Sequence, residues 1–161
     1  AATLSSNIGI YGPVFEQMIS DPIPGKEEYY MSEKFQLCHY NWSIENKLTT
    51  LISRINNVRK ENESYQQTNN IKFLETGNDQ LIAFYKWNDD KTNETLTVIS
   101  LDAYNSQSGS VQLPLYDLNI NHDQKIEVED LVTRNCYNWY NEWNYVELHA
   151  TLPFHIFKIN K

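Results

Sequence analysis

The chain has 161 residues, of which 40% are hydrophobic and 13% aromatic, so it holds enough apolar side chains to fold around a core. Thirteen Lys and Arg against twenty-one Asp and Glu give a formal net charge of −8, and no stretch gathers the basic residues into a stripe that could neutralise phosphates. No apolar run reaches the roughly 20 residues that span a bilayer, and the N-terminus has no signal-peptide pattern. We therefore expect a soluble, cytoplasmic chain without nucleic acid or membrane as a partner.

Residues 1–42 show no sustained hydrophobic period. A short apolar piece between Ile8 and Phe15 predicts a strand, and the prolines and glycine of residues 21–25 exclude regular structure after it. A loop of this length is usually functional, or it belongs to a domain whose other half lies elsewhere. We expect a strand followed by a long loop.

Residues 44–63 predict an amphipathic helix, because apolar side chains recur there at steps of three and four. Ser43 is the expected N-cap, and basic residues lie in the second half, where the helix dipole favours cations. Such a helix must pack its apolar stripe against a partner, since its own propensity cannot keep it folded in water.

After Gln66 the hydrophobic period changes to two, and eight short segments predict strands. Turn-like residues separate them, among them the segments 77–79 and 106–109. Short strands at this spacing indicate a mainly β fold, an antiparallel β-sandwich. The predicted strands are residues 71–75, 80–87, 94–101, 110–114, 125–132, 137–140, 144–149 and 154–159.

Motifs for metal or nucleophilic chemistry are absent from the sequence. Residues 117–123 imitate the start of a calcium loop, but His122 replaces the required glycine and Val128 the bidentate glutamate, which favours a plain polar loop. The four histidines form no HxxxH or HxH pair, and His149 and His155 are expected on strand faces. We expect no metal and no cofactor.

Two further features leave alternatives open. Glu27-Glu28 followed by Tyr29-Tyr30 suits sugar hydroxyls and sugar faces, although local evidence favours a solvated surface. Cys38 and Cys136 are expected as free thiols, with a disulfide as the less favoured reading.

Several segments, in order along the chain, resemble maltose-1-phosphate maltosyltransferases of glycoside hydrolase family 13, in the α-amylase superfamily. The resemblance begins with residues 2–16, which are similar to the eighth strand of the catalytic barrel and the turn after it. It continues through Pro24 to Tyr29, Ser32 to Phe35 and the helix, and it ends at residues 153–157. Further matching segments are residues 78–81, 101–102, 107–109, 111–115, 128–131 and 144–148.

This resemblance implies a domain division and a reaction. Residues 1–66 would be the last strand, loop and helix of a (β/α)8 barrel, and residues 67–161 the all-β C-terminal domain. The parent enzyme would transfer maltosyl units from α-maltose 1-phosphate to the non-reducing end of an α-1,4-glucan, with retention at the anomeric carbon. Retention needs two carboxyl groups about 5 Å apart. In the family these precede the part that this chain matches, so we expect the isolated chain to be inactive.

The resemblance also carries residues onto the chain. Lys34 and Phe35 match positions that contact the donor, where relatives commonly have Lys-Tyr, and Phe35 lacks the tyrosine hydroxyl. Tyr11, Gly12 and Glu16 match the barrel-end motif and are expected in the cleft wall, because barrel active sites lie at the C-terminal ends of the strands. The implied partners are the donor, the glucan, the rest of the barrel and a second copy of the parent in a homodimer.

Two alternatives remain at this point. The sandwich itself could bind glucan, because aromatic faces stack on sugars, although aromatic residues in strands are more often part of the core. The aromatic residues considered for this role are Trp87, Trp139, Trp143 and Tyr145. The other alternative is the C-terminal part of a related amylase-type hydrolase or of a trehalose-forming isomerase.

Overall fold

The computed structural model describes residues 1–10, 12–29 and 37–161. The chain divides into two compact units, one formed by Ala1–Asn7 with Val58–Lys161 and the other by Ile8–Asn57. The boundary between the units falls inside a helix, because Val58 near its end, with Asn62, Ser64 and Tyr65 after it, is buried in the first unit. The assignment of residues 1–66 to the end of a barrel stays a prediction.

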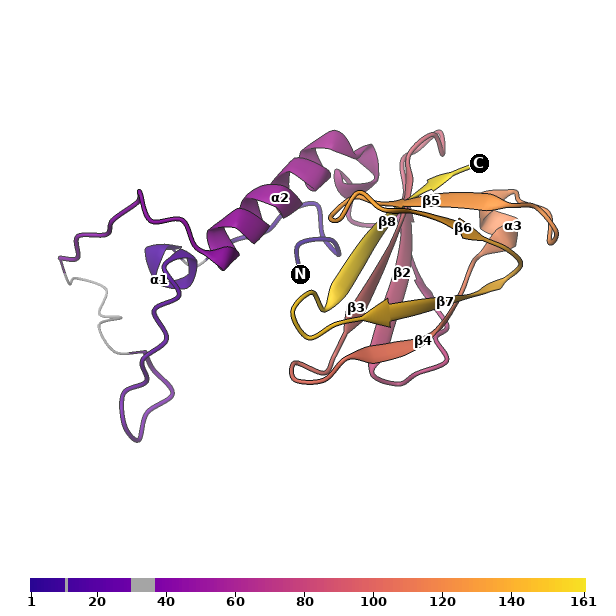
Figure 1. Ribbon diagram of the computed structural model, residues 1–161. Coiled ribbons are helices and arrows are strands. Elements are labelled where there is room, and N and C mark those ends of the chain that lie inside the picture. Colours follow the sequence, from indigo (N-terminus) through magenta and orange to yellow (C-terminus); the bar gives the residue numbers. More distant parts are fainter. Residues whose placement is uncertain (11, 30–36) are drawn as a thin grey trace. The chain divides into compact units, whose positions relative to one another are not determined.

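The first unit is an antiparallel β-sandwich, as expected (Figure 1). One sheet has six strands in the order β1-β2-β3-β8-β5-β6, and a second sheet pairs β4 with β7. All of these pairs are antiparallel. The strands are β1 (Ile71–Leu74), β2 (Leu81–Trp87), β3 (Glu94–Ser100), β4 (Gln107–Gln112), β5 (Ile126–Asp130), β6 (Cys136–Trp139), β7 (Trp143–Leu148) and β8 (Phe154–Asn160).

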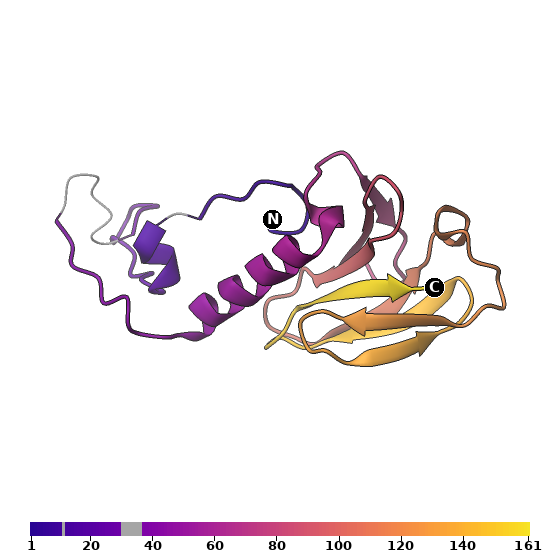
Figure 2. The same cartoon turned by 90° about the horizontal axis from the view of Figure 1, so that it is seen from above.

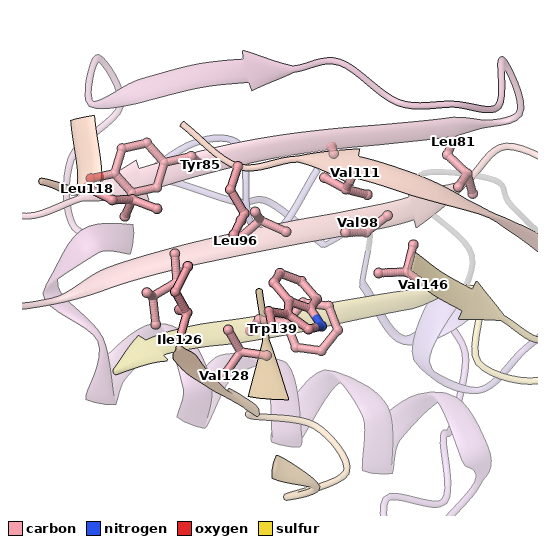
Figure 3. Close-up of a cluster of buried hydrophobic side chains, with 14 of the residues drawn as sticks. Leu81, Tyr85, Leu96, Val98, Val111, Leu118, Ile126, Val128, Trp139 and Val146 are labelled. Carbon is pink, nitrogen blue, oxygen red and sulfur yellow. The ribbon is translucent and has the colours of Figure 1, made fainter. Parts of the chain in front are cut away.

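The two sheets enclose the main core. Val98 of β3 and Val128 of β5 face Val111 of β4 and Val146 of β7, and all four are nearly or fully buried (Figure 3). Strands β5 and β7 show the expected alternation, and in β7 every second residue is buried and the others are exposed. This alternation explains why a period of two predicted the strands.

A second, smaller core explains why β2 and β3 are buried along most of their length. Val58 and Tyr65 pack with Ile156 of β8 in this cluster. The Tyr65 hydroxyl lies 3.2 Å from the Thr97 hydroxyl, and the Ser64 hydroxyl lies 3.0 Å from that of Thr95. The segment after the helix is therefore part of the sandwich.

Helix α2 (Lys47–Glu61) confirms the predicted helix, and Figure 2 shows it as one unbroken helix. It starts three residues later than expected, because Asn46 is the N-cap in place of Ser43. The Asn46 side-chain oxygen accepts hydrogen bonds from the backbone N–H groups of Leu48 at 2.9 Å and Thr49 at 3.0 Å. Ser43 instead donates its backbone N–H to the side chain of Asn41 at 3.0 Å. Both residues are good caps, and the local hydrogen bonds select the later one.

The strand expected between Ile8 and Phe15 is not formed. Residues 8–10 have no regular structure, and Gly12–Glu16 form the short helix α1. A strand requires backbone partners on a neighbouring strand, and no strand of the described part of the chain pairs with residues 8–10.

The first seven residues form turns that are tied to the sandwich. The Arg59 guanidinium donates to the carbonyl oxygens of Ser5 at 3.0 Å and Ser6 at 2.7 Å. The buried Lys86 ammonium donates to the carbonyls of Leu4 at 3.3 Å and Gln67 at 2.8 Å. Burial lowers the pKa of Lys86, and the neighbouring Arg59 lowers it further. In a β-strand, such carbonyl oxygens would accept hydrogen bonds from the backbone of a neighbouring strand. Here the Arg59 and Lys86 cations satisfy them instead.

Residues 107–109 are strand where the sequence predicted a turn. They open β4, in which Gly109 lies opposite Val146 of β7. A Cβ atom at Gly109 would lie 3.0 Å from the Asn78 Cβ and 3.3 Å from Leu81 Cδ1, so the glycine marks a close approach and not a bend. The sequence also gave no sign of the short helix α3 (Leu115–Leu118).

Candidate functional site

The predicted donor contacts, Lys34 and Phe35, lie outside the described residues, as does Tyr11 of the predicted cleft wall. Gly12 begins α1 with a positive φ of 49°, a backbone conformation that favours glycine. Glu16 ends α1, and its backbone carbonyl accepts a hydrogen bond from the Asn46 side-chain amide at 2.7 Å. The cap of α2 is thereby fastened to the end of α1.

The described loop residues of the second unit expose aromatic rings. Tyr29 is 51% exposed and pairs with Pro22 in an isolated antiparallel bridge. Trp42 is 66% exposed and meets the ring of Tyr40 edge-on, with 6.3 Å between the ring centroids. The sequence had drawn attention to Tyr29 and missed Trp42, which stands at the end of the loop. Such rings can pack against the apolar faces of sugars.

The sandwich contains a groove of about 480 Å³ that opens between β6, β7 and β8. Its lining mixes aromatic rings with hydrogen-bonding side chains. The lining residues are Thr133, Asn135, Tyr137, Trp139, Tyr145, Val146, Glu147, His149, Leu152, His155 and Phe157. No sequence motif had brought these residues together.

Aromatic packing builds the floor of the groove around Phe157 of β8. Trp139 and Tyr137 of β6 meet the Phe157 ring edge-on at centroid distances of 4.9 Å and 6.0 Å. His155 stacks on the same ring at 5.3 Å. Phe157 and Trp139 are buried, and Tyr137 is 39% exposed, so the cluster runs from the core to the groove mouth.

An ion pair supports one end of this floor. His155 Nδ1 lies 2.9 Å from the buried Asp130 carboxylate, and Nε2 lies 3.0 Å from the Glu147 carbonyl oxygen. A carboxylate and a carbonyl only accept, so both ring nitrogens donate when both bonds form, and the ring is then positively charged. The carboxylate also accepts hydrogen bonds from the Val132 N–H at 3.0 Å and the Thr133 hydroxyl at 2.6 Å.

The pKa values of the pair shift in opposite directions. Burial raises the pKa of Asp130, but the hydrogen bonds from His155, Thr133 and Val132 outweigh it and leave the pKa below its usual value. Burial lowers the pKa of His155, but the bonds to Asp130 and to the Glu147 carbonyl outweigh it and leave the pKa raised. Both directions favour the charged pair, which holds the floor in place and leaves neither group free for catalysis.

The four aromatic residues considered for glucan binding divide into two kinds. Trp139 is only 6% exposed and belongs to the core, as Figure 3 shows. Trp87 is half-buried and stacks on Tyr85 with 4.9 Å between ring centroids. For these two the favoured reading, that aromatic residues in strands are part of the core, is confirmed, because their rings pack in or against it. Trp143 and Tyr145 are 44% and 64% exposed, since both lie at outward positions of β7.

The segment 117–123, expected as a polar loop, begins inside α3 and continues as a turn-containing loop. The Asp117 carboxylate pairs with the Lys72 ammonium at 2.5 Å, and Asn119 caps the C-terminus of α3 in a left-handed conformation. Within the described residues, no three His, Cys, Asp or Glu side chains are grouped to hold a metal ion. Cys38 and Cys136 are free thiols, and Cys136 is exposed. Among the described residues, no helix is long and apolar enough to cross a membrane.

Comparison with known proteins identifies a matching family and several similar sequences. The sequence model of the family described as "GLGE, C-terminal" matches residues 73–159. An α-1,4-glucan:maltose-1-phosphate maltosyltransferase of Chlorobaculum tepidum is 40% identical over 99% of this chain and 25% of its own length. The protein of the same name from Salinibacter ruber is 36% identical over 99% of this chain and 24% of its length. The chain spans about a quarter of the length of the curated relatives it matches.

Solved structures share the fold. An α-amylase of Geobacillus thermoleovorans matches 76% of this chain and 25% of its own, with a TM-score of 0.56 and 12% identity. A maltogenic α-amylase from Thermotoga neapolitana matches 71% of this chain and 26% of its own, with a TM-score of 0.54 and 12% identity. At this identity the likeness concerns the fold alone.

Proposed function

The chain belongs to the family described as "GLGE, C-terminal", and on this basis we propose that it is the C-terminal part of a maltose-1-phosphate maltosyltransferase. The observation that carries the proposal is the match of relatives with that name along 99% of the chain, at 40% and 36% identity. The family match within the sandwich adds independent support, because it covers most of the residues after α2.

The proposed reaction moves a maltosyl unit from α-maltose 1-phosphate to the non-reducing end of an α-1,4-glucan. In a retaining transfer, one carboxylate attacks the anomeric carbon and phosphate leaves. A second carboxyl group then removes the proton from the acceptor hydroxyl as it displaces the enzyme carboxylate. We assign neither carboxyl group to this chain and expect both in the barrel of the parent protein. This chain would supply part of the cleft wall and a supporting domain.

Helix α2 supports the proposed place of residues 1–66 at the end of a barrel. Its apolar residues Leu48, Leu51, Ile52 and Ile55 all remain partly exposed, and Val58 is the one residue of the helix that is buried. An amphipathic helix of this kind is stabilised by packing on a partner. A neighbouring barrel helix and strand in the parent protein would cover this stripe.

We propose Lys34 as a donor contact and Phe35 as its neighbour in the site, with Tyr11, Gly12 and Glu16 in the cleft wall. A lysine ammonium that faces donor oxygens forms a charge-assisted hydrogen bond, which is stronger than a neutral one. Phe35 offers an aromatic face without a hydroxyl. The exposed rings of Tyr29 and Trp42 in the same unit are consistent with a sugar-binding wall.

Incubation of the full-length protein with α-maltose 1-phosphate and a malto-oligosaccharide tests the function. We expect phosphate release together with acceptors lengthened by two glucose units in α linkage. A related hydrolase would release free maltose without lengthening the acceptor, and an isomerase would convert maltose to trehalose without using the phosphate. Either of these results, in place of acceptor lengthening, would refute the proposed reaction.

A further inference from the structure

We propose that the sandwich groove between β6, β7 and β8 is a binding site for an α-1,4-glucan chain. The identity of the ligand rests on the proposed function, in which this polymer is the acceptor. The residues assigned to the ligand are Asn135, Tyr137, Tyr145 and His149, which line the mouth of the groove.

Two tyrosine rings from different strands converge on this groove. Tyr137 of β6 is 39% exposed and Tyr145 of β7 is 64% exposed, and both line it. The faces of a pyranose ring carry C–H groups, whereas its hydroxyls project from the edge. A sugar site therefore needs aromatic surface together with hydrogen-bonding groups around it. The exposed rings supply the surface, and the buried Phe157 and Trp139 hold the Tyr137 side in place.

Hydrogen-bonding capacity remains at the mouth. Within the described part of the chain, the side-chain amide of Asn135 and the hydroxyls of Tyr137 and Tyr145 bond to no other residue. The polar groups of the floor are already used, since Asp130 binds both His155 and Thr133. A fixed floor beneath free polar groups is a preorganised site, which lowers the entropic cost of binding.

The charge of the lining selects a neutral ligand. Of the residues that the structure describes, no lysine or arginine lines the groove, whereas the Glu147 side chain carries a negative charge there. The positive ring of His155 is balanced by Asp130. A sugar phosphate would meet a carboxylate without a compensating cation, so the donor is disfavoured and an uncharged glucan fits. The volume of about 480 Å³ lies in the range of about 300–1,000 Å³ that is usual for ligand pockets.

Affinity electrophoresis of the full-length protein through gels with increasing glycogen tests the site. We expect the wild-type protein to be retarded and Tyr145→Ala to raise the apparent Kd for glycogen about tenfold, since it loses an aromatic contact and its apolar area. Tyr145→Phe keeps the ring and should stay within about threefold of wild type. The matched control is Tyr104→Ala, which removes a tyrosine that is 89% exposed and lies outside the groove.

Maltosyl transfer to a short malto-oligosaccharide is measured on the same variants and separates this site from the proposed function. We expect unchanged transfer to the short acceptor and a raised KM for glycogen in Tyr145→Ala alone. If the wild type transfers maltosyl units but Tyr145→Ala migrates as the wild type does, the groove is not a glucan site and the proposed function stands. If retardation depends on Tyr145 but no transfer occurs, the glucan site stands and the proposed reaction fails. A lowered Tm in Tyr145→Ala with unchanged retardation means that another part of the protein covers the groove, and it also overturns the site.

Discussion

The ion pair beneath the groove predicts a large and pH-dependent loss of stability on Asp130→Asn. The wild-type carboxylate is buried and accepts three hydrogen bonds, from His155 at 2.9 Å, Val132 at 3.0 Å and Thr133 at 2.6 Å. Asparagine keeps the size of the side chain, but its single amide oxygen replaces only one of the two carboxylate oxygens, the one bonded to Val132 or the one bonded to Thr133 and His155. It also cannot balance the charge of His155, so the substitution removes the ion pair together with at least one hydrogen bond.

Removal of one partner from a buried ion pair costs about 3–5 kcal/mol. The His155 side chain keeps 15% of its surface exposed, so water compensates part of the loss and we expect about 3 kcal/mol. For a domain of roughly 100 residues, each kcal/mol lowers the Tm by about 4 °C, which gives a decrease of about 12 °C.

The pH dependence follows from the directions of the two pKa shifts. The raised pKa of His155 gives stability that is complete below its unfolded pKa of about 6.5 and is lost as the pH rises through the folded value. The lowered pKa of Asp130 gives stability that is present above its unfolded pKa of about 3.9 and is lost as the pH falls through the folded value. The difference between wild type and Asp130→Asn should therefore be largest between about pH 4 and 6.5.

Urea unfolding of the full-length protein at pH 5.5 and 8.5, followed by tryptophan fluorescence, measures this difference. Glu129→Gln is the control in the same hairpin, because Glu129 pairs with Arg134 at 3.1 Å in an exposed position and its loss should cost less than about 1 kcal/mol. A Gln substitution at His155 should abolish the pH dependence of the Asp130→Asn effect. Equal destabilisation by the Asp130 and Glu129 variants, or an Asp130 effect that grows from pH 5.5 to 8.5, would refute the charged pair.

Three further predictions concern the proposed enzyme. Lys34→Ala in the full-length protein should lower kcat/KM for α-maltose 1-phosphate about ten- to hundredfold at an unchanged Tm, because a charged hydrogen bond is worth about 1.5–3 kcal/mol. Overlapping donor saturation curves of wild type and variant would leave Lys34 without a role. The isolated 161-residue chain should release no phosphate from the donor above a buffer control, and turnover proportional to its concentration would contradict this. In the isolated chain, hydrogen exchange should be faster in residues 47–57 than in residues 81–100, since the helix stripe stays partly exposed; equal protection would show a complete docking surface within the chain.

Local patterns predicted most of the secondary structure of this protein. Seven of the eight strands and the long helix occur close to where the period of two or of about 3.6 predicted them, because that alternation depends on which side of one element faces a core, whereas β4 overlaps its predicted segment only in part. The outward position of Tyr145 follows from the same alternation in β7. The resemblance to the maltosyltransferases rests equally on the order of residues along the chain, and the family match confirms it.

Errors arose where the conformation depends on residues distant in sequence. Gly109 looks like a turn residue, but it lies in β4, where a Cβ atom would crowd the Asn78 side chain at 3.0 Å. Residues 8–10 are apolar enough for a strand, yet a strand forms only where another strand offers its backbone. The alternation of aromatic residues likewise could not show that Trp139 is buried, because its ring packs on Phe157 of a different strand.

The groove was decided by the tertiary structure alone. Asp130 and His155 belong to different strands, and β5 and β8 become neighbours only through the antiparallel pairing of the six-stranded sheet. Tyr137 and Tyr145 come from two different sheets. They meet at the mouth of the groove because the two sheets pack against each other around one core. A sequence pattern reports on neighbours within a few residues, whereas such convergence depends on which strands pair and which faces pack, and these long-range contacts are set by the whole domain.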